Sequence, residues 1–377
     1  MDAGVQQPAG EAPADQVASA GVGGLSLSRF RAVASPELID KVTGTYELDW
    51  TGESSDVGGD MNLNLVLSGA DGPAYVLRVY APWVGAKRLR FIQALRSYLR
   101  DSGLPFTETL VTKHGHGVVE ADGRVAEIER YVAGEKMTWD ASRQLRPALA
   151  MLGRVHAAMA LAAGLSGEQP PGHANHVEAE QALGWARRAA AVVRGWEDAR
   201  PAELALARDM VHLAEALPPR EAELAGAARR QLVHGDFWEH NVLFDSDDHI
   251  AAVLDLDFCG TRPRVDDLAY TLSGTASSLH SPTVEHAHWE SIRPAVDDYS
   301  QAVAPPLSLE ERRALPLAIA RVVLFVARHL VAEAELGAAA GFSRNHQRRM
   351  LAEIRDIVTW SLALAQDPEP VQAIFAE

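Results

Sequence analysis

One stretch of the sequence, QLVHGDFWEHNVLFDSDDHIAAVLDLDF at 231–258, constrains the fold more than any other. It gathers aspartates, histidines and an asparagine around two short apolar runs, although ionised carboxylates repel one another and are costly to bury unpaired. The runs 241–244 and 249–256 flank the turn-forming letters DSDD, a pattern that predicts a β-hairpin. We therefore expect a positive charge among these carboxylates.

The predicted hairpin brings Asn241 and Asp255 together. With the turn centred near residue 247 or 248, Asn241 faces residues 253–255, so Asp255 lies opposite or diagonal to it. Opposed side chains on one face have Cβ atoms about 4.5–5.5 Å apart. An amide oxygen and a carboxylate at that separation can share one hard cation such as Mg²⁺, which prefers oxygen ligands. Asp236 precedes the hairpin and could overlook the same ion, so the stretch predicts a divalent-metal site.

The sequence changes once from short runs with β character to mostly helical, alanine-rich segments, and this change predicts two lobes. At 377 residues the chain exceeds one average domain. Short runs with β character occur at 62–67, 74–80, 117–122 and 125–132. The stretch 84–103 has helical spacing, and from about residue 137 the chain is mostly helical and alanine-rich apart from the hairpin. We expect an α+β protein with a small antiparallel-sheet lobe, which holds one main helix, and a larger α-helical lobe.

Composition argues against several classes of partner. The net charge of −16 argues against a nucleic-acid partner, because affinity for phosphates comes largely from Lys and Arg. No apolar run approaches about 18 residues, so no membrane-spanning helix is expected. A single cysteine, Cys259, rules out an intrachain disulfide and fits a reducing cytoplasm. Residues 1–26 lack the features of a secretory signal and are expected to be disordered, and the sequence does not indicate an oligomeric state.

The motifs HGDFWEHN, VLDLDF and RPRVDDLA closely resemble the aminoglycoside phosphotransferase (choline/homoserine kinase-like) family. The spacing Asp-x-x-x-x-Asn, with an Asp after the next strand, matches the kinase arrangement of catalytic Asp and two metal-binding residues. The resemblance covers about residues 30–340 and implies a two-lobed protein-kinase-like fold. Beyond the tail at 1–26, it implies a nucleotide-binding N-lobe at 27–133 and a C-lobe at 134–377 that carries the catalytic loop, the metal site and the acceptor pocket.

The resemblance also implies an activity and roles for individual residues. The γ-phosphoryl group of ATP or GTP would pass to a hydroxyl of a small molecule, with Asp236 orienting that hydroxyl and taking its proton. Asn241 and Asp255 would hold Mg²⁺. The nucleotide would be contacted by Gly58, Gly59, Asn62, Arg78, Arg130 and Val132. The residues expected to support the metal or touch the substrate are His234, Trp238, His240 and Asp257.

Two departures from kinases keep alternatives open. Arg78 stands where kinases usually place a phosphate-gripping lysine, and the helix after it offers no glutamate partner for that charge. A nucleotide-binding pseudokinase is therefore an alternative of another class. A metallohydrolase that uses His234, Asp236, His240 and Asp255 is a third, but it lacks further ligand motifs. For the acceptor, an antibiotic or related natural product is the first expectation, and a metabolic sugar or amino alcohol is the second.

Overall fold

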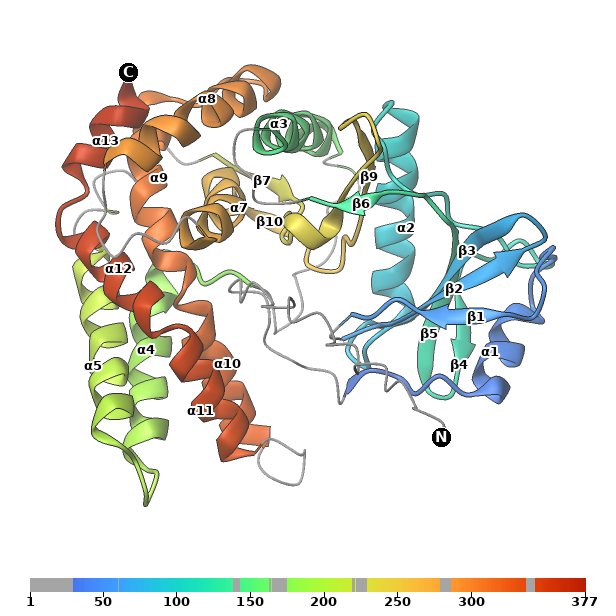
Figure 1. The fold of residues 1–377 in the computed structure, drawn as a ribbon, viewed down its shortest axis with the longest axis horizontal. Helices are drawn as coiled ribbons and strands as arrows, with labels where there is room; N and C mark the ends of the chain where they lie inside the picture. The colour runs from blue at the N-terminus through green and yellow to red at the C-terminus, as the bar shows by residue number, and fades with distance from the viewer. Residues whose placement is uncertain are drawn as a thin grey trace, which may run out of the picture.

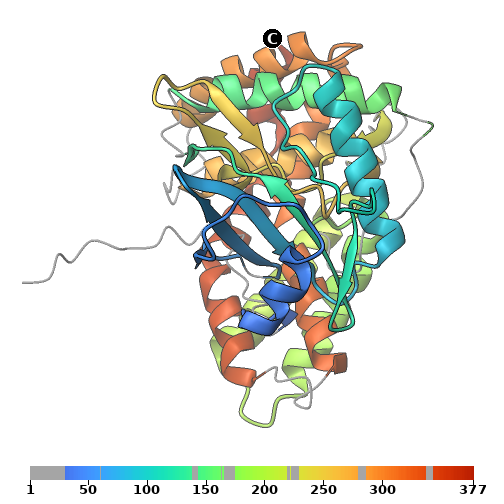
Figure 2. The same ribbon diagram turned by 90° about the vertical axis from the view of Figure 1, so that its right-hand side faces the viewer.

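The computed structural model describes residues 30–59, 61–137, 143–162, 164, 175–218, 221, 229–278, 286–336 and 343–377. The predicted tail at 1–26 lies outside these ranges. A sheet-containing N-lobe and a helical C-lobe stand side by side (Figure 1). Seen from the N-lobe side, the sheet and helix α2 lie in front of the helical lobe (Figure 2). The predicted α+β, two-lobed architecture is confirmed.

The N-lobe is built on a five-stranded antiparallel sheet with strand order β1-β2-β3-β5-β4. Its strands are β1 (Ser54–Asp56), β2 (Leu63–Gly69), β3 (Gly72–Val79), β4 (Val119–Ala121) and β5 (Arg124–Arg130). The expected main helix is α2 (Ala86–Asp101), whose Ile92, Leu95 and Leu99 join the large core cluster of the C-lobe. Helix α2 therefore couples the two lobes through buried apolar surface.

Sequence periodicity did not predict two N-lobe elements, helix α1 (Pro36–Thr43) and strand β1. The Ser35 side chain accepts a hydrogen bond from the Leu38 backbone N–H at 3.2 Å, and Pro36 occupies the first helical turn. A serine followed by proline is a recognisable helix start, so a search for caps would have found α1. Strand β1 is exposed and polar throughout, so it carries no hydrophobic signal.

The C-lobe packs helices around two small sheets (Figure 1). The helices are α3 (Leu145–Leu161), α4 (Ala179–Arg194), α5 (Pro201–Ala216), α7 (Arg264–Ser278), α8 (His286–Ala302), α9 (Leu309–Val322), α10 (Phe325–Leu336), α11 (Arg344–Glu353), α12 (Arg355–Gln366) and α13 (Glu369–Ala376). Strand β7 (Arg230–Val233) pairs with β10 (Gly260–Pro263), and β6 (Glu135–Lys136), β8 (Val242–Phe244) and β9 (Ile250–Val253) form the other sheet.

One helical stretch among the described residues, Leu309–Glu335, passes a length and composition test for crossing a membrane. In the fold, 89% of its most apolar window is buried, which is the environment of a core helix.

The predicted hairpin is strands β8 and β9. Val242 pairs with Val253 and Leu243 with Ala252, and the register shifts after Leu243 because of a bulge. The ladder continues for one more bond, since the Leu254 backbone N–H donates to the Asn241 carbonyl at 2.8 Å. The register expected from the sequence is therefore confirmed, although both strands are shorter than predicted.

Candidate active site

The loop that enters the hairpin is held in an unusual backbone conformation. Gly235 has a φ of 84°, and a Cβ atom there would lie 2.1 Å from the Phe258 carbonyl oxygen, so this close approach requires glycine. Asp267 on α7 fixes the loop because its carboxylate accepts the backbone N–H groups of His234 at 3.1 Å and Gly235 at 2.9 Å. Asp267 thus supports the loop.

Two histidines complete the support of this loop. His156 on α3 is fully buried, with Nε2 2.9 Å from Asp267 and Nδ1 2.7 Å from the Tyr299 hydroxyl. His234 accepts the Asp236 backbone N–H at Nδ1, which leaves Nε2 to donate to the Leu254 carbonyl at 3.0 Å. Burial lowers the pKa of His234, so the ring acts as a neutral brace between the loop and the hairpin.

The Asp236 carboxylate lies at the centre of the site and is buried. Its Oδ1 accepts hydrogen bonds from Asn175 at 2.6 Å and from the Tyr270 hydroxyl at 2.8 Å, and its Oδ2 accepts one from Asn241 at 2.9 Å. A carboxylate has about four acceptor positions, so one remains. Burial and the nearby charge of Asp255 raise the pKa of Asp236 to about 7. A carboxyl group with this pKa can accept a proton near neutral pH.

Three oxygen-bearing side chains gather beside Asp236. Asn241 uses its amide nitrogen on Asp236 and keeps its amide oxygen available. The Asp255 side chain is 25% exposed, and the buried Oδ1 of Asp257 accepts no hydrogen bond. An amide oxygen and two carboxylates, one with an unsatisfied buried oxygen, suit a hard divalent cation. The residue set therefore fits Mg²⁺.

Asp255 and Asp257 reach this position by a route that the sequence did not predict. The sequence run 249–256 predicted a strand that continues through Asp255, but β9 ends at Val253 and Asp255 has a φ of 63°. The expected extension is therefore wrong. The left-handed residue turns the chain, and the two carboxylates still converge because the Asp257 backbone N–H donates to Asp255 Oδ1 at 3.2 Å.

The two carboxylates differ in charge state. Burial disfavours ionisation of Asp255, but the Arg78 guanidinium and the Asp257 backbone N–H hold its pKa below the ordinary value. Burial and the Asp255 charge raise the pKa of Asp257 to about 8. The pair therefore carries less than two negative charges at neutral pH, and a cation would favour ionisation of both.

Arg78 on β3 points into this carboxylate group. Its Nη2 lies 3.1 Å from Asp255 Oδ2 and 4.0 Å from Asp257 Oδ1, and its Nη1 lies 3.6 Å from Glu129 Oε1. The side chain is buried and lies 5.2 Å from the centre of the Tyr80 ring. A solvent-facing arginine is thereby excluded, and Arg78 is the positive charge expected among the carboxylates.

The glutamates near Arg78 come from a strand, and the helix supplies a second arginine. Strand β5 places Glu127 opposite Arg78, with Glu129 diagonal to it. Helix α2 contributes Arg96, which pairs with Glu127 at 2.9 Å and with Glu129 at 3.2 Å. Arg78 therefore belongs to a buried network of two arginines and two glutamates.

The glycine-rich segment lies between β1 and β2. Gly58 and Gly59 have φ values of 85° and 113°, and a Cβ atom on Gly59 would lie 2.6 Å from Asn64 Nδ2. The Asn62 side chain is occupied at both ends, since its Nδ2 donates to Asp257 Oδ2 at 2.6 Å and its Oδ1 accepts the Ala81 backbone N–H. Asn62 therefore ties this segment to the carboxylate group.

The other predicted residues lie around the site. Arg130 and Val132 lie at the end of β5 and in the crossing to the C-lobe, where the Arg130 backbone N–H already donates to the Glu108 carbonyl at 2.9 Å. Trp238 is half-buried and packs on the exposed His240, with ring centres 4.2 Å apart. His240 also lies 3.4 Å from Glu239, and its ring contacts no metal-ligand candidate among the described residues.

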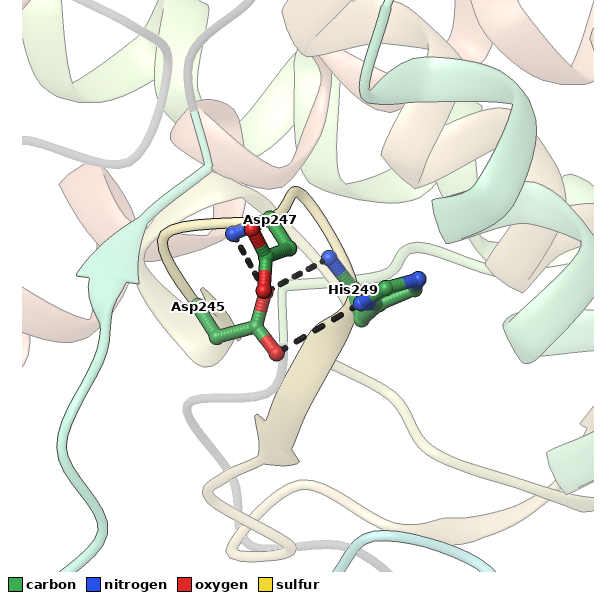
Figure 3. Close-up of side chains that lie close together, drawn as sticks. All are labelled: Asp245, Asp247 and His249. Carbon is green, nitrogen blue, oxygen red and sulfur yellow. Dashed lines mark hydrogen bonds and ion pairs between the residues drawn. The ribbon is translucent and has the colours of Figure 1, made fainter.

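A second acidic group stands at the far end of the hairpin, where Asp245, Asp247 and His249 lie close enough to share an ion (Figure 3). All three are exposed. Asp245 Oδ1 accepts the backbone N–H groups of Asp247 and His249, each at 2.9 Å. These bonds account for the cluster as a turn-forming motif, so it carries no metal assignment here.

Sequence reasoning missed the two residues that donate to Asp236 from outside the motif. Tyr270 stands three residues after Asp267 on the same helix and could have been suspected from that spacing. Asn175 lies 61 residues before Asp236 and gives no local signal.

Comparison with known proteins gives consistent matches. A sequence profile of the phosphotransferase enzyme family (APH) matches residues 58–302, more than half of the chain. Homoserine kinase from Caulobacter vibrioides is 25% identical over 212 residues, so the match covers 56% of this chain and 62% of that protein. The microcompartment-associated aminopropanol kinase superposes with a TM-score of 0.61 at 17% identity, over 90% of this chain and 99% of its own. An amicoumacin kinase in complex with AMP-PNP, Ca²⁺ and Ami superposes with a TM-score of 0.58 at 14% identity, over 90% of this chain and 95% of its own.

Proposed function

We propose, from the premise that the chain belongs to the phosphotransferase enzyme family, that it transfers the γ-phosphoryl group of ATP or GTP to a hydroxyl of a small molecule. Residues 27–133 form the nucleotide-binding lobe in this proposal, and residues 134–377 carry the acceptor. The observation that supports it most is the meeting of Asp236, the three oxygen-bearing side chains and Arg78 in one buried place.

Phosphoryl transfer depends mainly on alignment and on charge neutralisation. The acceptor hydroxyl donates to the remaining position on Asp236, which orients the hydroxyl and takes its proton. Asn241 and Asp255 would hold Mg²⁺, with Asp257 in support, and the ion would supply neutralisation of phosphate charge. In this proposal the Arg78 guanidinium exchanges Asp255 for the phosphates. Glu129, which is itself held by Arg96, keeps the guanidinium near the site.

The glycine-rich segment at Gly58 and Gly59 covers the phosphates in this proposal. Asn62 acts by holding Asp257, because both ends of its side chain are already bonded. Val132 meets the nucleobase through its backbone, since the Arg130 N–H is engaged with Glu108. Trp238 and His240 remain candidates to touch the acceptor, because they lie just before Asn241 at the start of the hairpin and pack on each other.

Two classes of acceptor remain for this site. An antibiotic or related natural product is supported by the structural similarity to the amicoumacin kinase. An amino alcohol or amino acid is supported by the similarities to aminopropanol kinase and homoserine kinase. A weak nucleotide-binding pseudokinase is the alternative of another class, although the presence of Asp236, Asn241 and Asp255 in one site argues against it.

The test is a phosphorylation screen of hydroxylated antibiotics and primary metabolites with ATP and with GTP, with and without Mg²⁺. Mass spectrometry of the acceptor locates the new phosphate. Magnesium-dependent transfer to any acceptor supports the proposal. Tight nucleotide binding without transfer to any of them would favour the pseudokinase.

A further inference from the structure

A group of three basic side chains, Arg262, His176 and Arg328, lies next to the donors of Asp236, and neither arginine pairs with a carboxylate among the described residues. Arg262 on β10 is only 4% exposed, and its Nη1 is buried without a hydrogen-bond partner. No ion pair joins its guanidinium to a carboxylate within the ranges that the structure describes. An unpaired buried charge costs considerable free energy of folding, so its presence calls for a physical reason.

Two further basic side chains, His176 and Arg328, lie near enough to Arg262 to interact with its charge. His176 is buried; its Nε2 makes a long contact of 3.4 Å with Asp267 Oδ1, and its Nδ1 has no hydrogen-bond partner. Arg328 on α10 is half-buried, and its Nη1 lies 3.5 Å from the His176 carbonyl oxygen. In the described part of the chain, Arg328 forms no ion pair with a carboxylate.

The acidic side chains nearby are already paired elsewhere. Asp266 forms a buried ion pair with Arg321. Asp267 accepts two backbone N–H groups and a histidine, as described for the loop. Glu178 pairs with Arg230 at 3.1 Å. Neither Arg262 nor Arg328 forms an ion pair with any of these carboxylates. Burial and, less strongly, the charge of Arg328 lower the pKa of Arg262, and the charges of Asp267, Asp266 and Glu178 oppose that shift without reversing it.

This basic group lies close to the Asp236 carboxylate, with the Tyr270 ring between His176 and Asp236. Asn175, which donates to Asp236 at 2.6 Å, is the residue directly before His176. Tyr270, which donates to Asp236 at 2.8 Å, has its ring centre 5.2 Å from that of His176. The basic group and Asp236 are therefore linked through the same two residues, Asn175 and Tyr270.

We infer that Arg262, Arg328 and His176 bind an anionic group of the acceptor, and that the acceptor is a hydroxylated carboxylate. This inference rests on the proposed phosphotransferase function and specifies its acceptor class. A guanidinium matches a carboxylate with two parallel hydrogen bonds, which would satisfy the buried Nη1. The same two positive charges disfavour polycationic acceptors of the aminoglycoside type.

The test is equilibrium binding of two matched probes, 4-hydroxybutyrate and 1,4-butanediol, which differ in one terminal carboxylate. Ligand-observed NMR titration of the full chain measures both dissociation constants, even in the millimolar range. We expect 4-hydroxybutyrate to bind at least about tenfold more tightly, and Arg262→Gln to remove that difference. Equal binding of the two probes, or an unchanged preference in Arg262→Gln, would overturn the inference.

Thermal stability separates a ligand-binding arginine from a structural one. Arg264 is a matched control, since it is equally buried two residues away but is paired with Glu311 at 2.8 Å and with two carbonyl oxygens. We expect Arg264→Met to lower Tm and to keep the probe preference once folded. Arg262→Met should leave Tm unchanged or raise it by roughly 1–3 °C, because it removes an unpaired buried charge. A loss of Tm in Arg262→Met as large as that in Arg264→Met would assign Arg262 to the fold and contradict the inference.

The binding assay needs no phosphoryl transfer, so its outcome is independent of the phosphorylation screen. Anion-selective binding without transfer to any acceptor would count against the proposed function alone. Transfer to neutral or cationic acceptors without anion selectivity would count against this inference alone. Arg328→Gln should weaken 4-hydroxybutyrate binding without changing nucleotide binding, which provides a second and independent variant.

Discussion

The two ends of the β8–β9 hairpin carry similar side chains in opposite environments. At the turn, Asp245, Asp247 and His249 are exposed, and the backbone of the turn itself supplies the hydrogen bonds (Figure 3). The opposite end, called the mouth here, is where Asn241, Asp255 and Asp257 lie. There Asp255 and Asp257 are held against Arg78, and one buried carboxylate oxygen, Oδ1 of Asp257, accepts no hydrogen bond. An acidic cluster alone therefore does not identify a metal site, and in this chain the buried carboxylate oxygen without a hydrogen bond favours the Asp255 end of the hairpin over the turn as the candidate.

Both ends also use an aspartate in the left-handed region. Asp248 in the turn has a φ of 58°, and Asp255 at the mouth has a φ of 63°. Aspartate tolerates this conformation in turns, so Asp248 follows from local turn chemistry. Asp255 lies two residues after the end of β9, where the same conformation aims its carboxylate back at Arg78. The same backbone state therefore serves chain reversal at one end and side-chain placement at the other.

The largest difference between the two ends should come from Asp236→Asn compared with Asp247→Asn. Asp236→Asn removes the group that orients and deprotonates the acceptor, so kcat should fall by about 10²–10⁴-fold while nucleotide binding and folding stay nearly intact. Asp247→Asn, an equal change at the turn, should leave kcat unchanged. Steady-state kinetics of both variants checks this, and a variant at Asp236 that keeps half of wild-type kcat would refute the assignment.

The pH profile gives a second measure of Asp236. Its pKa is raised to about 7 by burial and by the charge of Asp255, so the base form is lost as pH falls below that value. We expect kcat/KM for the nucleotide, which reports ionisations of the free enzyme, to decrease as pH falls through about 7. A profile that stays flat from pH 8 to pH 5 would contradict this role.

The next largest effect should come from the metal ligands at the mouth. Asn241→Ala or Asp255→Ala removes an oxygen ligand, so magnesium-dependent nucleotide affinity should fall by roughly 10²-fold or more. Titration of Mg²⁺ against nucleotide affinity measures this loss. Asp245→Ala is the control at the turn and should keep the wild-type magnesium requirement. If Asp255→Ala also kept it, the mouth would be no better a metal site than the turn.

The sequence predicted the hairpin and the proximity of its two candidate metal ligands, Asn241 and Asp255, because these signals are local. Turn letters and strand alternation determine the register that brings Asn241 near Asp255. Contacts between distant segments could not be predicted in this way. Glu129 approaches Arg78 only through the β3–β5 register, and Asn175 reaches Asp236 only through the packing of the helical lobe. The left-handed turn at Asp255 was also missed, because aspartate adopts that conformation without a sequence signature.

A smaller effect is expected from Arg78, which connects the mouth of the hairpin to the N-lobe. Arg78→Ala should raise KM for the nucleotide and lower kcat together, by roughly 10–100-fold in kcat/KM, because the cation contacts phosphates in ground and transition states. Steady-state kinetics with varied nucleotide measures both parameters. Kinetics indistinguishable from wild type would confine Arg78 to a structural pairing with Asp255.

Two variants test how Arg78 is positioned. Arg78→Lys should restore part of the activity, since the charge survives while the bidentate geometry does not. Glu129→Gln should raise KM by less than Arg78→Ala does, because Asp255 and Asp257 still attract the guanidinium. If Glu129→Gln lost as much activity as Arg78→Ala, the strand glutamate would be as necessary as the arginine itself.

The smallest effect should come from the turn, where Asp245 acts on stability alone. Asp245→Ala removes the acceptor of two backbone N–H groups, so Tm should fall by roughly 1–3 °C while activity is unchanged.

The hydrogen bond from the His249 backbone lowers the pKa of Asp245. A lowered carboxyl pKa stabilises the fold above the ordinary value of 3.8, and that contribution is lost as pH falls through the folded-state pKa. The Tm difference between wild type and Asp245→Ala should therefore be full at pH 7 and narrow at pH 3. Thermal unfolding at both pH values measures it, with Asp247→Ala as the matched control because the Asp247 carboxylate accepts no hydrogen bond within the described residues. A loss of activity in Asp245→Ala without a loss of Tm would give the turn a functional role and remove the contrast between the two ends of the hairpin.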